Sequence, residues 1–222
     1  MKKEKLYFYL TGNWYKGDMP NFYDVTDFES TKLLEKNYSA IKEEILNFYE
    51  RDALSFKANF TPYKYKEQGW QTINLISFML KRQSNIKKFP VLFDAVSKIP
   101  DLLTIQIAVL KPQTRVKAHF GDTNAIIRSH LGIVVPGTLP DIGFRNGTEE
   151  KCWEEGRVLA ICVAHRHYVW NNTDKTRIIL LVDTIHPDFR EEKTWICSGL
   201  LSAAFLKLIA TKLPVTKKRL IL

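Results

Sequence analysis

All five histidines of this 222-residue chain lie between positions 119 and 186, so this is the region where metal chemistry is possible. A ferrous ion is commonly held by a histidine and a carboxylate two residues apart, together with a distant second histidine. His119 has glycine, Gly121, at the carboxylate position. Asp122 would face the opposite side of a regular strand, so it could bind a metal only if the chain bulged there. The spacing therefore predicts no simple triad with an acidic ligand.

A second histidine could come from the segment His165-Arg166-His167. His165 and His167 are two residues apart and would project from the same face of a strand. Spacing alone leaves open which of the two would bind a metal.

Two arginines in apolar segments point to anion binding. Arg128, two residues before His130, lies within residues 125–135, and Arg177 begins the apolar segment 177–182. A buried guanidinium is costly unless it meets an anion, and its planar fork suits a carboxylate. That anion is either a bound carboxylate ligand or an Asp or Glu of the chain itself.

The segments that must position these residues change in character along the chain. Residues 6–28 predict short strands or loops at a sheet edge, and residues 27–50 predict a helix capped by Asp27 or Ser30. Residues 70–80 predict a strand, and residues 89–99 a short helix that starts at Pro90. Short apolar segments then predict strands at 104–110, 116–120, 125–135, 142–145, 157–163, 167–170 and 176–185. Helices followed by evenly spaced strands indicate an antiparallel sandwich or barrel.

Composition narrows the class of protein. There are 33 Lys and Arg against 24 Asp and Glu, and the net charge of +9 favours anionic partners. The basic residues are scattered and carry no nucleic-acid-binding motif, so we expect no nucleic-acid partner. Three cysteines without a C-x-x-C motif argue against disulfides and a thiolate zinc site. We therefore expect a cytoplasmic protein, and residues 6–11 make a poor signal peptide.

Residues 194–213 form an apolar segment that is followed by the basic cluster 217–219. Lys207 and Lys212 make a membrane-spanning helix improbable. The segment is expected to be a helix that packs on the sheet or on a partner, or one that lies peripherally on a membrane surface.

The motifs occur in an order that resembles a known family. They are His119-x-Gly121-x-x-Asn124, Arg128-x-His130-Leu131-Gly132, Trp153-x-Glu155-Gly156, His167-x-Val169-Trp170-Asn171, Arg177 and Asp183-x-x-His186-Pro187. Together they resemble the aspartyl/asparaginyl β-hydroxylase family of Fe(II)- and 2-oxoglutarate-dependent dioxygenases, over residues 111–188.

The resemblance implies a double-stranded β-helix, a mainly β jelly roll of the cupin type preceded by helices. It implies a single catalytic domain over residues 1–193, with a helical lead-in at 1–100 and the β-helix core at 101–193. Residues 194–222 would form an apolar and basic extension.

The resemblance also implies roles for the polar residues. His119 and His167 would hold Fe(II), and glycine at position 121 is a family trait. Arg128 and His130 would bind the oxoacid end of 2-oxoglutarate, and Arg177 its distal carboxylate. O2 would take an open position on the metal.

Some positions depart from the pattern of the family, and other notable residues are expected to lie outside the iron site. Ala108 stands where a serine is common, and Cys162 and Val163 replace an acidic pair, which affects cosubstrate binding. Tryptophans 153 and 170 are expected to pack rather than to bind substrate. His165 is expected at the rim of the site. The last strand and its turn are expected to be closed by Asp183, His186 and Pro187.

The sequence thus predicts a dioxygenase that hydroxylates a C–H bond. The favoured substrate is the β-carbon of an aspartyl or asparaginyl residue, in a protein, a peptide or a small amino-acid derivative. The first alternative is an acyl chain of a lipid at the membrane surface, of the lipid A or ornithine-lipid type. The second is a catalytically silent scaffold that binds a carboxylate or a protein partner. The oligomeric state and the stereochemistry do not follow from the sequence.

Overall fold

The computed structural model describes residues 4–9, 13–58 and 69–212, with the backbone alone for 207–212. Its helices are α1 (Glu29–Lys36), α2 (Tyr38–Asp52), α3 (Gln83–Ile86), α4 (Pro90–Val96) and α5 (Lys193–Lys212), with 3-10 turns η2 (Val25–Asp27), η3 (Ala53–Ser55) and η4 (Pro187–Phe189). The basic cluster 217–219 lies outside the described residues.

The strands form two sheets. The larger sheet has the order β1 (Lys57–Ala58), β2 (Trp70–Ser77), β4 (Leu102–Leu110), β11 (Arg177–Ile185), β6 (Ile126–Val134) and β9 (Val158–Cys162), and β3 (Leu80–Lys81) pairs with β2. The smaller sheet has the order β5 (Thr114–Phe120), β10 (Arg166–Asn171), β7 (Ile142–Asn146) and β8 (Glu149–Lys151). From β4 onward the chain alternates between the sheets, except that β7 and β8 form a hairpin within the smaller sheet, and this is the strand order of a double-stranded β-helix. The predicted fold is confirmed.

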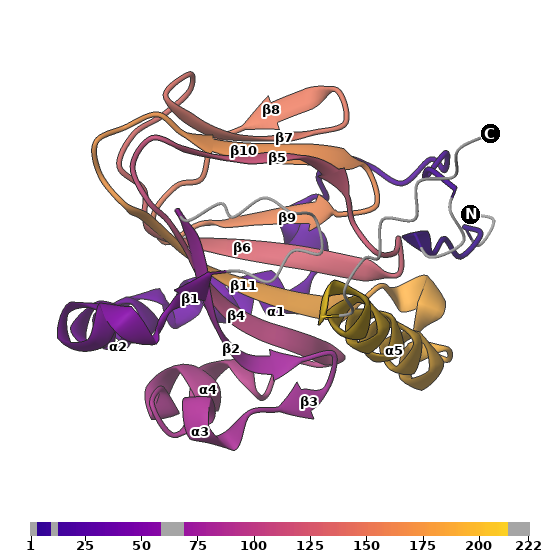
Figure 1. Ribbon diagram of the computed structural model, residues 1–222, viewed down its shortest axis with the longest axis horizontal. Coiled ribbons are helices and arrows are strands. Elements are labelled where there is room, and N and C mark those ends of the chain that lie inside the picture. The colour runs from indigo at the N-terminus through magenta and orange to yellow at the C-terminus, as the bar shows by residue number, and fades with distance from the viewer. Residues whose placement is uncertain (1–3, 10–12, 59–68, 213–222) are drawn as a thin grey trace, which may run out of the picture.

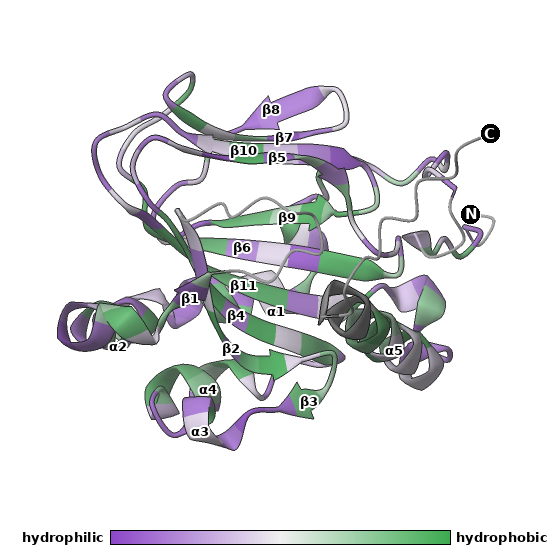
Figure 2. Ribbon diagram, in the orientation of Figure 1, coloured by the Kyte–Doolittle hydropathy of each residue, from purple (hydrophilic) through white to green (hydrophobic). Residues whose placement is uncertain are grey.

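The helices and the two sheets form three layers, because each element buries its apolar surface against a neighbour. Helices α1 to α4 cover the outer face of the larger sheet, and the smaller sheet lies over its inner face (Figure 1). Apolar residues concentrate on the strands of the larger sheet, whereas β8 at the edge is hydrophilic (Figure 2). Helix α5 packs through Ile196 and Leu200 into a separate cluster with Leu103 and Ile185. The functional residues must therefore lie between the two sheets or at their ends.

The local predictions need two corrections. The helix predicted over residues 27–50 is interrupted, because Asn37 leaves the helical conformation and its side-chain N–H donates to the carbonyl of Leu33 at 2.8 Å. Phe28 occupies the N-cap position of α1, so neither Asp27 nor Ser30 caps it. The helix that begins at Pro90 is confirmed. Strand β8 was missed because Glu149–Lys151 is an exposed, charged edge segment with no apolar alternation.

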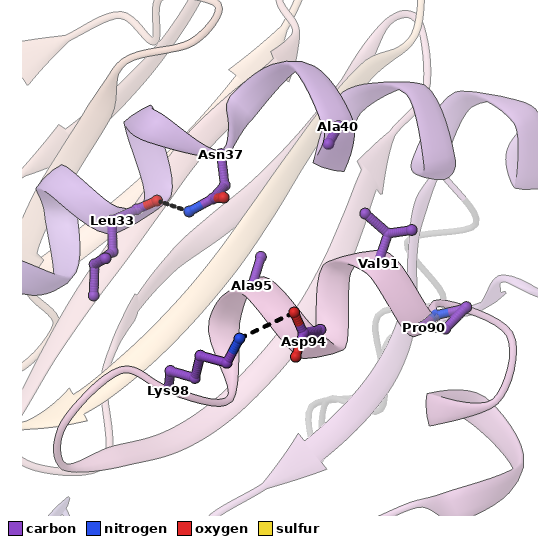
Figure 3. A pocket seen from close by; sticks show the side chains of 8 residues that line it. All are labelled: Leu33, Asn37, Ala40, Pro90, Val91, Asp94, Ala95 and Lys98. Atoms are coloured by element: carbon purple, nitrogen blue, oxygen red, sulfur yellow. Dashed lines mark hydrogen bonds and ion pairs between the residues drawn. The ribbon is translucent and has the colours of Figure 1, made fainter.

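A shallow groove of about 460 Å³ lies on the helical layer between α1, α2 and α4 (Figure 3). On the α4 side of it Lys98 pairs with Asp94 at 3.1 Å, but both side chains are largely exposed. Exposed pairs of this kind contribute little to stability and do not require a ligand. The residues that could do chemistry lie elsewhere.

No helix in the described part of the chain combines the length and the apolarity needed to cross a membrane.

Candidate functional site

The five residues predicted for the site come together in one cavity between the two sheets, which encloses about 50 Å³ of free space. Polar groups line it from both sides: His119, Arg128, His130, His167 and Arg177. The rest of the lining is apolar: Trp70, Ala108, Val116, Phe144, Val163, Val169, Ile179 and Leu181. Charged and metal-binding groups are thus enclosed by side chains that exclude water.

His119 and His167 lie side by side on adjacent strands of the smaller sheet. They are direct cross-strand partners on β5 and β10, and their ring centroids are 4.2 Å apart. The Nδ1 atom of His119 lies 2.8 Å from the carbonyl oxygen of Lys117, and Nδ1 of His167 lies 2.9 Å from that of His165. A carbonyl oxygen only accepts, so each Nδ1 carries the proton. Each Nε2 therefore keeps a lone pair that can bind a metal.

A β-bulge aims His119 into the cavity. His167 pairs with His119 and Val169 with Val116, so β5 has one residue more than β10 over this stretch. The extra residue lets both Val116 and His119 line the cavity although they are three positions apart. It also turns the carbonyl of Lys117 toward the imidazole that it accepts from.

Burial keeps both imidazoles neutral. It lowers the pKa of His119, and it lowers the pKa of His167 well below the ordinary value, where the neighbouring His119 adds to the effect. Neutral imidazole is the form that binds a metal ion.

Gly121 is fixed as glycine by a close backbone approach. A Cβ atom built at this position would lie 2.4 Å from the carbonyl oxygen of Val163, the same oxygen to which the Gly121 N–H donates at 2.8 Å. Asp122 is not among the residues that line the cavity. Over the described ranges no cluster of three or more His, Cys, Asp or Glu could hold a metal ion. The side chains available for an ion here are the two histidines.

His165 does not line the cavity. Its Nε2 lies 2.7 Å from the carbonyl oxygen of Met19, and its ring packs edge-on against Tyr15. Spacing left open whether His165 or His167 is the second candidate metal ligand. The structure favours His167, because of these two rings only that of His167 lines the cavity between the sheets.

Arg177 is a buried cation that has no counter-ion in the described part of the chain. Its residue is only 3% exposed, its guanidinium lies 4.5 Å from the ring centre of Trp153, and its Nε has no hydrogen-bond partner. None of the carboxylates that the structure describes pairs with it. Burial lowers the pKa of Arg177 below its ordinary value, because the charge lacks compensation. This group calls for an anion that none of the described residues supplies.

His130 presents an unpaired donor to the same cavity. Its Nδ1 accepts the indole N–H of Trp153 at 3.3 Å, so the proton of the neutral ring lies on Nε2. That Nε2 is buried and has no partner. Burial lowers the pKa of His130 well below the ordinary value, and Arg128 and Arg177 lower it further. Trp153 thus acts as packing and as an orienting donor, as expected for a buried tryptophan.

Arg128 already has an internal partner. Its Nε and Nη2 donate to the two carboxylate oxygens of Asp183 at 2.8 and 2.9 Å, across the strand pair β6 and β11. Asp183 is completely buried on β11, two residues before the strand ends at Ile185, and His186 and Pro187 begin the turn that follows, so the prediction that these residues close the last strand is confirmed. A lone acid in an apolar strand, opposite an arginine, was the signal that could have identified it. Among described residues, nothing accepts from Nη1 of Arg128.

The positions that depart from the family divide between the cavity and its surroundings. Ala108 and Val163 line the cavity, whereas Cys162 is buried outside it, and burial raises the pKa of its thiol. Trp70 also lines the cavity and was missed, because a strand tryptophan carries no signal of its own. Trp170 donates its indole N–H to the carbonyl of Pro140 at 2.7 Å and packs, as predicted.

Solved structures resemble this chain at the level of fold. A prolyl hydroxylase from Trichoplax adhaerens, in complex with a hypoxia inducible factor peptide fragment, matches 70% of this chain and 81% of its own, with a TM-score of 0.46 and 9% identity. A prolyl-4-hydroxylase from Pseudomonas putida matches 67% and 87%, with a TM-score of 0.43 and 15% identity.

Sequence comparison is more specific. The chain is 34% identical over 172 residues to an ornithine lipid ester-linked acyl 2-hydroxylase of Rhizobium tropici, covering 76% of this chain and 61% of the relative. It is 30% identical over 173 residues to the human aspartyl/asparaginyl β-hydroxylase, covering 74% and 22%. The chain thus spans less than two thirds of either relative. The sequence model of the aspartyl/asparaginyl β-hydroxylases matches residues 35–187, a range that contains every polar residue of the cavity. The chain therefore belongs to the aspartyl/asparaginyl β-hydroxylase family.

Proposed function

We propose that this protein is a hydroxylase that uses Fe(II), 2-oxoglutarate and O2. The observation that carries the proposal is that one cavity brings together two imidazoles with free Nε2 atoms and a buried guanidinium that has no counter-ion among the described residues. A purely structural core would not retain an uncompensated arginine beside two open metal ligands.

His119 and His167 suit a ferrous ion. Both rings are neutral and have their Nδ1 protons held by backbone carbonyls, and their centroids are close enough for one ion to contact both Nε2 atoms. When bound, iron would supply the oxygen activation and hydrogen abstraction that no side chain can perform. The chain supplies the orientation of the two rings and keeps solvent out.

Arg177, His130 and Arg128 suit the two ends of a dicarboxylate. The guanidinium of Arg177 would bind the distal carboxylate, which would compensate its buried charge. Nε2–H of His130 and Nη1 of Arg128 would donate to the oxoacid end, nearer the iron ligands. Asp183 holds the Arg128 fork with two hydrogen bonds, so this donor is oriented before a ligand arrives.

For the substrate, we propose a C–H bond at the β-carbon of an aspartyl or asparaginyl group. The human relative is named for that reaction, and the net charge of +9 would attract an acidic group. The second candidate is a lipid acyl chain, as the name of the Rhizobium relative states for that protein. An exposed aromatic surface that contacts β5 through Phe120 favours it. A cytoplasmic setting is part of the proposal and is supported by three free cysteines.

Anaerobic titration with Fe(II) and 2-oxoglutarate tests this proposal, because the ternary complex should give a metal-to-ligand absorption band in the visible range. We expect the band in the wild type and its loss in His167→Ala and Arg177→Met. His165→Ala and Arg145→Met are the matched controls, since these residues lie outside the cavity, and they should keep the band. A wild type with no band at saturating iron would favour the catalytically silent scaffold.

A further inference from the structure

An exposed aromatic surface lies on the N-terminal segment and on α5. A groove of about 880 Å³ is lined by parts of the N-terminal segment and by Trp195 of α5. Among its residues Trp14 is 69% exposed and Trp195 is 63% exposed. Isolated exposed apolar residues are ordinary, but large aromatic side chains gathered in one groove indicate an interaction site.

This groove contacts the strand that carries one of the two candidate iron ligands. The ring of Trp14 stacks on Phe120, with centroids 5.8 Å apart and planes inclined by 13°. Phe120 directly follows His119, one of the two candidate iron ligands. The groove therefore adjoins β5, the strand that carries His119.

The N-terminal segment is held in place by buried hydrogen bonds. The side chain of Asn124 accepts from the backbone N–H of Tyr7 at 2.8 Å and donates to the carbonyl of Lys5 at 3.0 Å. The N–H of Tyr9 also donates to the carbonyl of Asp122 at 2.9 Å. The groove is thus a fixed part of the fold, joined to the turn that follows β5.

Helix α5 continues the aromatic surface. Residues 195 and 206 are 11 positions apart, which places them within about 20° of each other around a helix. Trp195, Phe205 and Leu206 are all more than 60% exposed, whereas Ile196 and Leu200 of the opposite face are buried. Trp195 packs edge-on against Phe8, with centroids 5.3 Å apart, which joins the helix to the groove. Figure 1 shows α5 and the N-terminal segment on the same side of the molecule.

Positive charges surround this surface. Lys5 and Lys16 line the groove, and the exposed Arg166 is the cross-strand neighbour of Phe120. In the described part of the chain no salt bridge neutralises these three cations. One exposed acid, Asp18, lies on the same segment, and Glu4 accepts from the hydroxyl of Tyr15 at 3.0 Å. The three cations outnumber the two acids, so the surface combines exposed tryptophans with a small excess of positive charge.

We propose that this surface, made of Phe8, Trp14, Trp195, Phe205 and Leu206, binds peripherally to a lipid bilayer that carries anionic headgroups. Tryptophan is enriched at the depth of lipid headgroups, and basic residues are attracted by the negative surface potential. A second copy of the chain fits less well, because pairing this surface with itself would oppose the same cations. The inference does not depend on the proposed chemistry, since binding to vesicles needs neither iron nor cosubstrate.

The first experiment measures co-sedimentation of the full chain with vesicles of phosphatidylcholine alone and of phosphatidylcholine with phosphatidylglycerol. We expect binding to the anionic vesicles that falls as salt is raised from about 0.05 to 0.5 M. Trp195→Glu combined with Phe205→Glu should weaken it by roughly tenfold or more. The matched control is Leu54→Glu, which changes an 85% exposed leucine next to α2 and should bind like the wild type.

The second experiment identifies the face that touches the lipid. Trp14 and Trp195 are exposed, whereas Trp153 and Trp170 are buried. Acyl-chain-brominated lipids should quench the fluorescence of the wild type. Trp14→Phe combined with Trp195→Phe keeps the surface apolar, so it should still bind but lose the quenching.

Failure of the wild type to bind anionic vesicles would overturn the proposal. Equal binding by the double glutamate variant would also overturn it, as would quenching that persists in the double phenylalanine variant. A concentration-dependent dimer that the glutamate variant abolishes, without vesicle binding, would assign the surface to self-association instead.

Discussion

The two sheets hold their functional groups in different ways. On the smaller sheet, backbone carbonyls orient the two imidazoles, and no charged side chain is involved. On the larger sheet, side chains do this work: Asp183 holds Arg128, and Trp153 orients His130. A hydrogen bond to a backbone carbonyl holds a metal ligand as rigidly as the strand pair itself. A contact with another side chain instead sets the charge and the orientation of the group. The site therefore separates metal binding, set by strand geometry, from anion binding, set by buried electrostatics.

The largest effect should come from the smaller sheet. His167→Ala removes one of two nitrogen ligands, and with no third protein ligand among the described residues the ion would be held by a single ring. We expect iron affinity to fall by more than about 100-fold and turnover by more than about 1000-fold. Isothermal titration with Fe(II) under anaerobic conditions measures the first. His165→Ala should leave both unchanged, and a His167→Ala variant that binds iron normally would refute the ligand assignment.

Arg177→Met distinguishes most directly between metal binding by the smaller sheet and anion binding by the larger sheet. Iron binding should persist, whereas 2-oxoglutarate affinity should fall by about 100-fold, since a buried charged partner is lost. The free energy of unfolding should rise by about 1–3 kcal/mol, because an uncompensated charge is replaced by an apolar side chain. Titration and urea denaturation measure the two effects, with Arg145→Met as control. A variant that loses stability would show that Arg177 has a structural partner.

Asp183→Asn tests the internal pair on the larger sheet. It leaves the guanidinium of Arg128 without its counter-ion, and the free energy of unfolding should fall by about 2–3 kcal/mol, less than for a fully buried pair because Arg128 is 28% exposed. Urea denaturation measures the change. The exposed Asp141 provides the control variant Asp141→Asn, which should have little effect. Equal stability of the two variants would mean that the pair contributes nothing.

Gly121→Ala tests the backbone approach near the metal ligands. Because the added Cβ would meet the carbonyl of Val163, the free energy of unfolding should fall by about 1–3 kcal/mol. Gly137→Ala is the control, since its nearest neighbour would be a methyl group at 3.3 Å. For the same reason Gly121→Asp should not create a third iron ligand. Tighter iron binding by that variant would contradict the steric explanation.

The smallest effect is a pH dependence of the metal-free protein. Burial lowers the pKa values of His119, His130 and His167, so the unfolded chain binds more protons than the folded one below pH 6.5. This stability is fully present above pH 6.5 and is lost as the pH falls toward the lower folded pKa values. Each group should contribute up to about 1.4 kcal/mol per pH unit. Urea denaturation at pH 7.5, 6.5 and 5.5 measures the slope, which should be shallower in His130→Leu, and a flat profile would contradict these shifts.

Much of the larger-sheet site could be predicted from the sequence. Arg128 and His130 are two residues apart on β6 and so project from the same face of the strand. An arginine in a buried apolar segment needs an anion, whatever the position of the strand in the sheet. The partner could not be predicted, because Asp183 lies 55 positions away and its contact depends on the register of β6 against β11. The ordered motifs identified the family and its fold, because their order constrains far more than the spacing of any one motif.

The smaller sheet was less accessible to such reasoning. Strict alternation from Val116 would have turned His119 away from the cavity, and only the bulge reverses that. The choice between His165 and His167 likewise depended on which ring points between the sheets.

The sequence alone determined most of the elements, the fold class and the set of chemical groups, because these depend on local periodicity, on residue types and on the order of the motifs. The tertiary structure alone decided that Gly121 must remain without a side chain, that Arg128 is held by Asp183, and that Arg177 has no counter-ion among the described residues. It also decided that Trp14 lies beside Phe120. These properties depend on distances between residues far apart in the chain, and such distances are set only when the two sheets pack together.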